Sequence, residues 1–174
     1  MGNERREIPT GFFWKKCPGA DMLVPMPDTW FFIPSPVSGT FAYGFAPERT
    51  PNKYGFLDTA LSINVMPKLQ KQMNMSPEDL ARRSLVENPA TVPLGEIEVS
   101  ESAHFVTARG RFTAPALKLA GMDVPPQWYN ADHTVNKDTG TFYMFTFNTP
   151  LDQKEEYEEI SEVMVGQRVL NRNF

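Results

Sequence analysis

The stretch TFYMFTFNTPLDQKEEYEEISEVMVG, which covers residues 141–166, decides the fold. Its first nine residues are rich in the aromatic and apolar side chains that are typical of β-strands. Because successive strand residues point to opposite faces, Phe142 and Met144 lie on one face and Phe145 on the other. Apolar side chains on both faces predict a central strand that is covered from both sides.

The second part of this stretch predicts an amphipathic helix after Pro150. Asp152 is the expected N-cap, because the acidic Glu155 follows it three residues later. Apolar residues at helical spacing form one buried stripe, and acidic residues form a solvated face. The stripe consists of Tyr157, Ile160, Val163 and Met164, and the acidic face consists of Glu155, Glu158, Glu159 and Glu162.

Two more elements follow from clear patterns nearer the N-terminus. Residues 59–65 alternate between apolar and polar side chains, which places Ser62 and Asn64 on the face opposite the apolar ones. This alternation predicts a half-buried strand. A helix is expected to begin at Ser76 as N-cap, with Pro77 at its first position, and to stop before Pro89.

Shorter runs of aromatic and β-branched residues, bounded by proline or glycine, predict the remaining strands. We expect them at residues 11–16, 22–25, 30–34, 40–46, 94–102, 104–113 and 128–135. Residues 114–127 contain three prolines and predict a long irregular connection. Runs of strands with only two convincing helices indicate the α+β class, with a mainly antiparallel β-sheet and helices packed on it.

Composition predicts one globular domain over residues 1–174, with residues 1–10 as a flexible N-terminal tail. The chain has 174 residues, a net charge of -4 and 41% hydrophobic residues. Nucleic acid is not expected as a partner, because its binding needs clustered Lys and Arg. No apolar run is long enough for a signal peptide or a membrane span, so we expect no membrane insertion and a cytoplasmic location. The oligomeric state stays open.

The order of these elements resembles the PsbP-like superfamily. The resemblance rests on the lead PMPDTW at residues 25–30, on FTFNTP at 145–150 and on QRVL at 167–170 after the acidic helix. It implies an α-β-α sandwich around an antiparallel sheet. The family consists mostly of non-catalytic proteins, among them extrinsic photosystem subunits and a nuclear-transport factor that binds a small GTPase. No catalytic motif of the family carries over to this chain.

The residues that could carry chemistry do not form a known motif. A single cysteine, Cys17, excludes an internal disulfide framework and a zinc site built from several cysteines. Asp132 and His133 could supply two metal ligands or an acid-base pair, but neighbouring strand residues point to opposite faces. Neither a phosphate-binding loop nor a dinucleotide fingerprint occurs in the sequence. We therefore assign no catalytic residue, no metal and no cofactor.

The sequence favours a non-enzymatic protein-binding or adaptor module, with another protein as its partner. Exposed aromatic and basic side chains are common anchors of such interfaces. We expect the contacts around Trp30, Arg109, Trp128, Tyr129 and His133.

Two alternatives remain open at this stage. One is a small-molecule or hydrolytic site in residues 114–133, which would use Asp132, His133 or Cys17. The other is a subunit whose role is assembly alone.

Overall fold

A computed structural model describes residues 7–37, 40–52, 57–88, 90–119 and 121–174. Residues 1–6 of the expected tail and Pro89, the expected helix stop, lie outside the described residues. The strands are β1 (Phe12–Cys17), β2 (Met22–Pro27), β3 (Phe31–Val37), β4 (Thr40–Ala46), β5 (Ala60–Met66), β6 (Val92–Pro93), β7 (Glu98–Glu101), β8 (Phe105–Ala114), β9 (Leu117–Leu119), β10 (Met122–Val124), β11 (Gln127–Asn136) and β12 (Phe142–Pro150). The helices are α1 (Leu69–Met73), α2 (Pro77–Val86), the 3-10 turn η1 (Leu151–Gln153) and α3 (Lys154–Gly166).

Eight strands form one antiparallel sheet in the order β3-β4-β5-β12-β11-β8-β6, and β7 also pairs with β8. The first part of the stretch 141–166 forms the middle of this sheet, because β12 lies between β5 and β11. Its side chains are buried on both faces, with Phe145 in one core cluster and Phe142 in the other. The prediction of a central, doubly covered strand is therefore confirmed.

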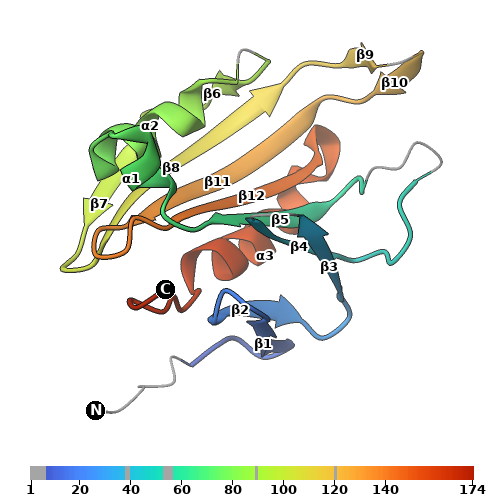
Figure 1. Cartoon of the computed structure of the whole chain (residues 1–174). Coiled ribbons are helices and arrows are strands. Elements are labelled where there is room, and N and C mark those ends of the chain that lie inside the picture. Colours follow the sequence, from blue (N-terminus) through green and yellow to red (C-terminus); the bar gives the residue numbers. More distant parts are fainter. Residues whose placement is uncertain (1–6, 38–39, 53–56, 89, 120) are drawn as a thin grey trace.

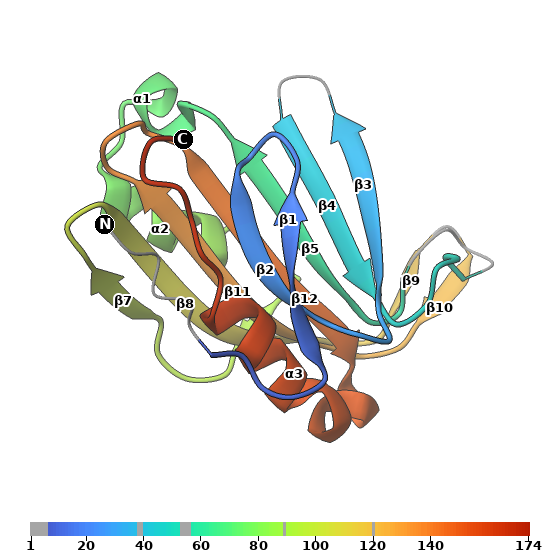
Figure 2. The ribbon, with the colours of Figure 1, turned by 90° about the horizontal axis from the view of Figure 1, so that it is seen from below.

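The two faces of the sheet carry different layers. Helix α3 and the β1–β2 hairpin cover one face, whereas α2 packs on β8 and β11 on the other face (Figures 1 and 2). Below the sheet, as Figure 1 is drawn, Trp128, Phe145 and Met164 belong to the larger core cluster. Above it, Leu80 and Leu85 of α2 pack with the smaller cluster. This arrangement is the expected α+β layout, a mainly antiparallel sheet between helical layers.

The two predicted helix starts have different outcomes. Ser76 caps α2 as expected, since its side chain accepts a hydrogen bond from the backbone N–H of Asp79 at 3.1 Å. The prediction for Asp152 is wrong. The 3-10 turn η1 occupies 151–153, so α3 begins only at Lys154 and its N-cap is Gln153, which makes no side-chain cap.

Residues 114–127 contain regular structure, so the prediction of an irregular connection is also wrong. β9 and β10 pair as a separate antiparallel hairpin, in which Lys118 lies opposite Asp123. Figure 1 shows this hairpin projecting beyond the ends of β8 and β11. The prolines that suggested a loop flank the hairpin instead of interrupting it.

Candidate functional site

The structure does not bring the five expected binding residues together. Three of them belong to β11, where side chains alternate between the faces of the sheet. Trp128 therefore points to the α3 side, whereas Tyr129 and His133 point to the α2 side. Arg109, which pairs with Asp132, also lies on the α3 side. One partner surface cannot contact all five side chains at once.

The two tryptophans of the expected binding set, Trp30 and Trp128, are core residues, which corrects the expectation that they lie at the surface. Trp30 is 6% exposed, and its ring stacks on Phe147 at 6.0 Å between centroids. Trp128 is fully buried, with Lys154 Nζ 5.9 Å from the centre of its ring. A sheet that is covered on both faces has a hydrophobic layer on each face, and these large rings fill much of the layer on the α3 side.

Arg109 belongs to a buried ionic cluster under the end of α3. Its Nη2 atom lies 2.9 Å from Oδ2 of Asp132, and Nη1 of Arg168 lies at the same distance from that oxygen. Asp132 is fully buried, and Arg168 also donates from Nη2 to the Thr134 hydroxyl at 2.7 Å. The cluster ties β8 and β11 to the segment that follows α3.

The sequence did not reveal this cluster. In the sequence, Arg168 belongs to the QRVL segment, 36 residues away from Asp132, and no local pattern joins the two residues. The Asp132 carboxylate is fully buried, so a movement that separates it from its arginines would leave a buried charge without a partner. Arg109 therefore has a structural role as a partner of Asp132, although its side chain stays partly accessible to solvent.

His133 pairs with a serine of helix α2. Its Nδ1 atom lies 2.7 Å from the Ser84 hydroxyl, and burial lowers the pKa of His133 to about 4. The neutral imidazole thus fills the layer between α2 and the sheet, edge-on to Phe142. Asp132 lies on the opposite face, as the strand alternation predicted, so it does not orient this ring as an acid would in a catalytic triad.

The remaining candidates are also enclosed. Tyr129 is half-buried beside the α2 cluster, and this burial raises the pKa of its hydroxyl. Cys17 is fully buried in β1, and burial raises the pKa of its thiol to about 12. A thiol with so high a pKa is a poor nucleophile at neutral pH. Because Asp132 and His133 lie on opposite faces of the sheet, these two side chains and Cys17 cannot all line one site.

Half of the α2-side face of the sheet has no helix over it among the described residues. In Figure 1, α1 and α2 lie above β8 and β11, while the upper faces of β4 and β5 carry no helix. One row of residues crosses the sheet from the uncovered side to the side covered by α2. In order across the strands, the row consists of Ile33, Gly44, Ser62, Thr146 and Ala131, and α2 covers the last of these. We call this surface the open half-face; it consists of Ile33, Ala42, Gly44, Ser62, Asn64 and Thr146.

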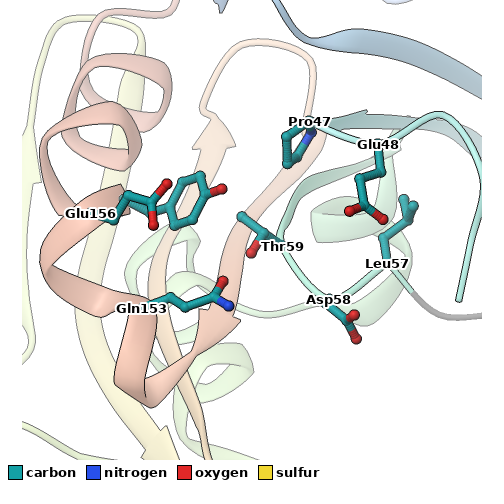
Figure 3. A pocket seen from close by; sticks show the side chains of 8 residues that line it. Pro47, Glu48, Leu57, Asp58, Thr59, Gln153 and Glu156 are labelled. Carbon is teal, nitrogen blue, oxygen red and sulfur yellow. The ribbon is translucent and has the colours of Figure 1, made fainter.

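A hollow of about 200 Å³ lies at the N-terminal end of α3. Glu48, Asp58 and Glu156 are among its lining residues (Figure 3), and Oδ1 of Asp58 accepts a hydrogen bond from Asn52 at 2.8 Å. Its other lining residues are Pro47, Leu57, Thr59, Gln153 and Tyr157. The hollow thus combines three acidic groups with an aromatic ring and two apolar side chains.

Two further properties concern the described part of the chain only. There, no three His, Cys, Asp or Glu side chains gather in a way that could hold a metal ion. Within the same ranges, no helix combines the length and the apolar character that are needed to cross a membrane.

Comparison with known proteins identifies the fold. No protein-family model matches the sequence, and no curated protein matches it. Solved structures do match. Cyanobacterial PsbP (CyanoP) from Synechocystis has 11% sequence identity and a TM-score of 0.58, with 98% of this chain and 99% of that chain covered. The chain therefore has the PsbP-like fold.

Two other proteins with this architecture show how widely it is used. The Ran-binding protein Mog1p from Saccharomyces cerevisiae has 11% identity and a TM-score of 0.54, covering 91% of this chain and 95% of that chain. LpqN from Mycobacterium tuberculosis, which is involved in cell envelope biogenesis, has 11% identity and a TM-score of 0.58, covering 86% and 83%. At this identity the likeness concerns the fold, and function has to be argued from the surface of this chain.

Proposed function

We propose that this chain is a non-enzymatic protein-binding module that docks a folded partner on its open half-face. The observation that carries the proposal is the uncovered half of the sheet. Its exposed side chains, Ser62 and Asn64, are small and polar, and its neighbours Ala42 and Gly44 are smaller still. Such a surface lets a partner approach the strands closely without removing a large charge from water.

A protein with a similar fold supports the choice of a protein as the partner on the open half-face. Mog1p, which shares this fold, is named for binding Ran, itself a protein. Both outer edges of the sheet are poor templates for strand addition. β3 contains Pro34 and Pro36, and the opposite edge consists of the two-residue β6, which contains Pro93, and of β7, which begins and ends with a glutamate. A partner is therefore better accommodated on the face than along an edge. A cytoplasmic location is part of this proposal, and fractionation of source cells tests it.

Site-specific photo-crosslinking tests the surface. A photoreactive amino acid replaces Ser62 on the open half-face in one variant and Ser100 on β7 in a matched control, since both are exposed serines in strands. We expect a crosslink to a defined protein from position 62 alone, and binding of that protein when both are purified. Equal crosslinking from both positions, or crosslinks only between copies of this chain, would contradict the proposal.

A further inference from the structure

The hairpin of β1 and β2 lies outside the eight-stranded sheet and forms a two-stranded sheet of its own. Figure 2, which views the molecule from below, shows β2 on the side of α3 and β1 on the side of β3 and β4. One edge of the hairpin is covered, because Leu23 of β2 exchanges two backbone hydrogen bonds with Val169, each at 2.9 Å. The opposite edge belongs to β1, and no other described strand pairs with it.

The register shows which backbone groups of β1 point to this edge. In an antiparallel pair, residues that bond to the partner strand alternate with residues whose N–H and C=O point away from it. Leu23 bonds to Val169 and lies opposite Lys16, so the N–H and C=O of Lys16 point away from β2. At the other end of the hairpin, the Asp28 N–H donates to the Gly11 C=O at 2.9 Å, which fixes the same alternation.

The backbone of Trp14 has the same orientation as that of Lys16. Trp14 lies opposite Pro25, whose nitrogen has no hydrogen to donate, which agrees with a pair that exchanges no hydrogen bonds. Trp14 and Lys16 thus present two N–H donors and two C=O acceptors, and no described residue outside β1 bonds to these four groups. Such a row of groups is a template for the backbone of an additional extended strand.

The side chains on one face of this edge favour an apolar contact. Phe13 and Lys15 point to the main sheet, on the same face of the hairpin as the buried Cys17. Phe13 is nevertheless 41% exposed, and Nζ of Lys15 lies 4.6 Å from the centre of the half-buried Phe32 ring of β3. An apolar side chain on an added strand would lie beside Phe13 and remove it from water.

The side chains on the other face favour an acidic contact. Lys16 points away from the main sheet and pairs with Asp21 at 3.0 Å, and both side chains are more than half exposed. Such a surface pair contributes little, so Lys16 can also pair with an acidic side chain directly opposite it on an added strand. A second copy of β1 would instead bring two further lysines to this edge, which repulsion between like charges disfavours.

We infer that β1 receives an extended segment of a partner protein as an additional strand of the hairpin. The backbone of that segment bonds to Trp14 and Lys16, an acidic side chain lies opposite Lys16, and an apolar side chain covers Phe13. This contact goes beyond the proposed function, because the open half-face takes a folded surface and β1 takes an extended chain. The edges of the main sheet differ from β1, which contains no proline.

Amide hydrogen exchange of the chain alone tests the edge residue by residue. We expect slow exchange at Phe13 and Lys15, whose amides bond to β2, and fast exchange at Trp14 and Lys16. Protection of Trp14 and Lys16 that grows with protein concentration would place a second copy at the edge. Protection that is independent of concentration would show that the chain covers its own edge. Either result would overturn the inference.

A synthetic peptide then replaces the unidentified partner. The probe is a short blocked peptide in which valine alternates with threonine and one central glutamate. One control peptide has lysine in place of the glutamate, and the other has proline in place of the two central valines. We expect the probe to slow exchange at Trp14 and Lys16, the lysine peptide to bind more weakly and the proline peptide not to bind. Equal effects of all three peptides, or no protection by any of them, would overturn the inference.

Two variants at one position isolate the backbone hydrogen bond. Trp14→Pro removes the outward N–H without removing a bond to β2, whereas Trp14→Val removes the same indole and keeps the N–H. We expect Trp14→Pro to bind the probe about tenfold more weakly than Trp14→Val, and equal affinities would overturn the inference. If circular dichroism shows that Trp14→Pro is unfolded, the exchange of the native chain with the three peptides decides. These experiments involve neither Ser62 nor the crosslinked partner, so their failure leaves the proposed function intact.

Discussion

Asp132 and His133 are neighbours in β11, and the alternation of the strand places them in different chemical environments. Asp132 binds two arginines under α3, whereas His133 lies neutral beneath α2. The opposite placement follows from the sequence, because strand geometry alone dictates it. Their partners, Arg168 and Ser84, cannot be read from the sequence in this way, since such pairs join residues distant in the chain.

Removal of the Asp132 carboxylate leaves Arg168 without its counter-charge. The side chain of Arg168 is 9% exposed, so Asp132→Ala is expected to lower the free energy of unfolding by about 3–5 kcal/mol. Urea denaturation measures this loss. Asp138→Ala is the control, because the Asp138 pair with His104 is exposed and is expected to contribute less than about 1 kcal/mol. Similar small losses in both variants would show that the cluster is not a buried ionic centre.

His133 makes stability depend on pH in a defined direction. Its pKa is about 4 in the folded chain and about 6.5 when unfolded, so the unfolded state binds more protons between these values. The stabilisation is complete above pH 6.5 and is lost as the pH falls to 4, by up to about 3 kcal/mol. Urea midpoints at pH 7 and pH 4.5 should therefore differ less in His133→Gln than in the native chain. An identical difference in both would refute the assignment.

At the scale of elements, the sequence predicted those whose signals are local. The alternation of residues 59–65 predicted β5, including the outward Ser62 and Asn64 that now define the open half-face. Local signals were insufficient where an element depends on its surroundings. Prolines at the base of the β9–β10 hairpin resemble loop residues, and the hollow consists of three segments that only the folded sheet brings together.

The contributions of Ser76 and Asp152 to the N-terminal ends of α2 and α3 can be compared by mutating each residue to alanine. Ser76→Ala removes the cap of α2 and is expected to lower the free energy of unfolding by about 1 kcal/mol. Asp152→Ala is expected to change it by less than about 0.5 kcal/mol, because Asp152 lies in η1 and caps no helix. Urea denaturation of both variants measures the difference. A larger loss for Asp152→Ala would restore the sequence-based assignment of that residue as N-cap.

At the scale of the whole molecule, the two core clusters share one sheet. Phe142 and Phe145 of β12 contribute to different clusters although they are three residues apart. Each cluster packs against the same central strands. If one layer separates from the sheet, it exposes strands against which the other cluster also packs. We therefore propose that residues 1–174 fold as one cooperative unit.

Cooperativity can be tested through the smaller cluster. Leu80→Ala in α2 leaves a cavity above the sheet and is expected to cost about 2–5 kcal/mol. Tryptophan fluorescence reports on Trp30 and Trp128 below the sheet and on Trp14 in β1, and far-UV circular dichroism reports on the whole backbone. Both signals should shift to the same lower urea midpoint. Two separate midpoints would contradict a single cooperative unit.

Binding of a protein partner on the open half-face can be measured directly. The measurement compares the affinity of the crosslinked partner for the native chain, for Ser62→Arg and for the control Ser100→Arg. Both serines are exposed, so neither change is expected to impair folding. We expect at least a tenfold loss of affinity for Ser62→Arg and native affinity for Ser100→Arg. Native affinity in Ser62→Arg would contradict binding on this surface.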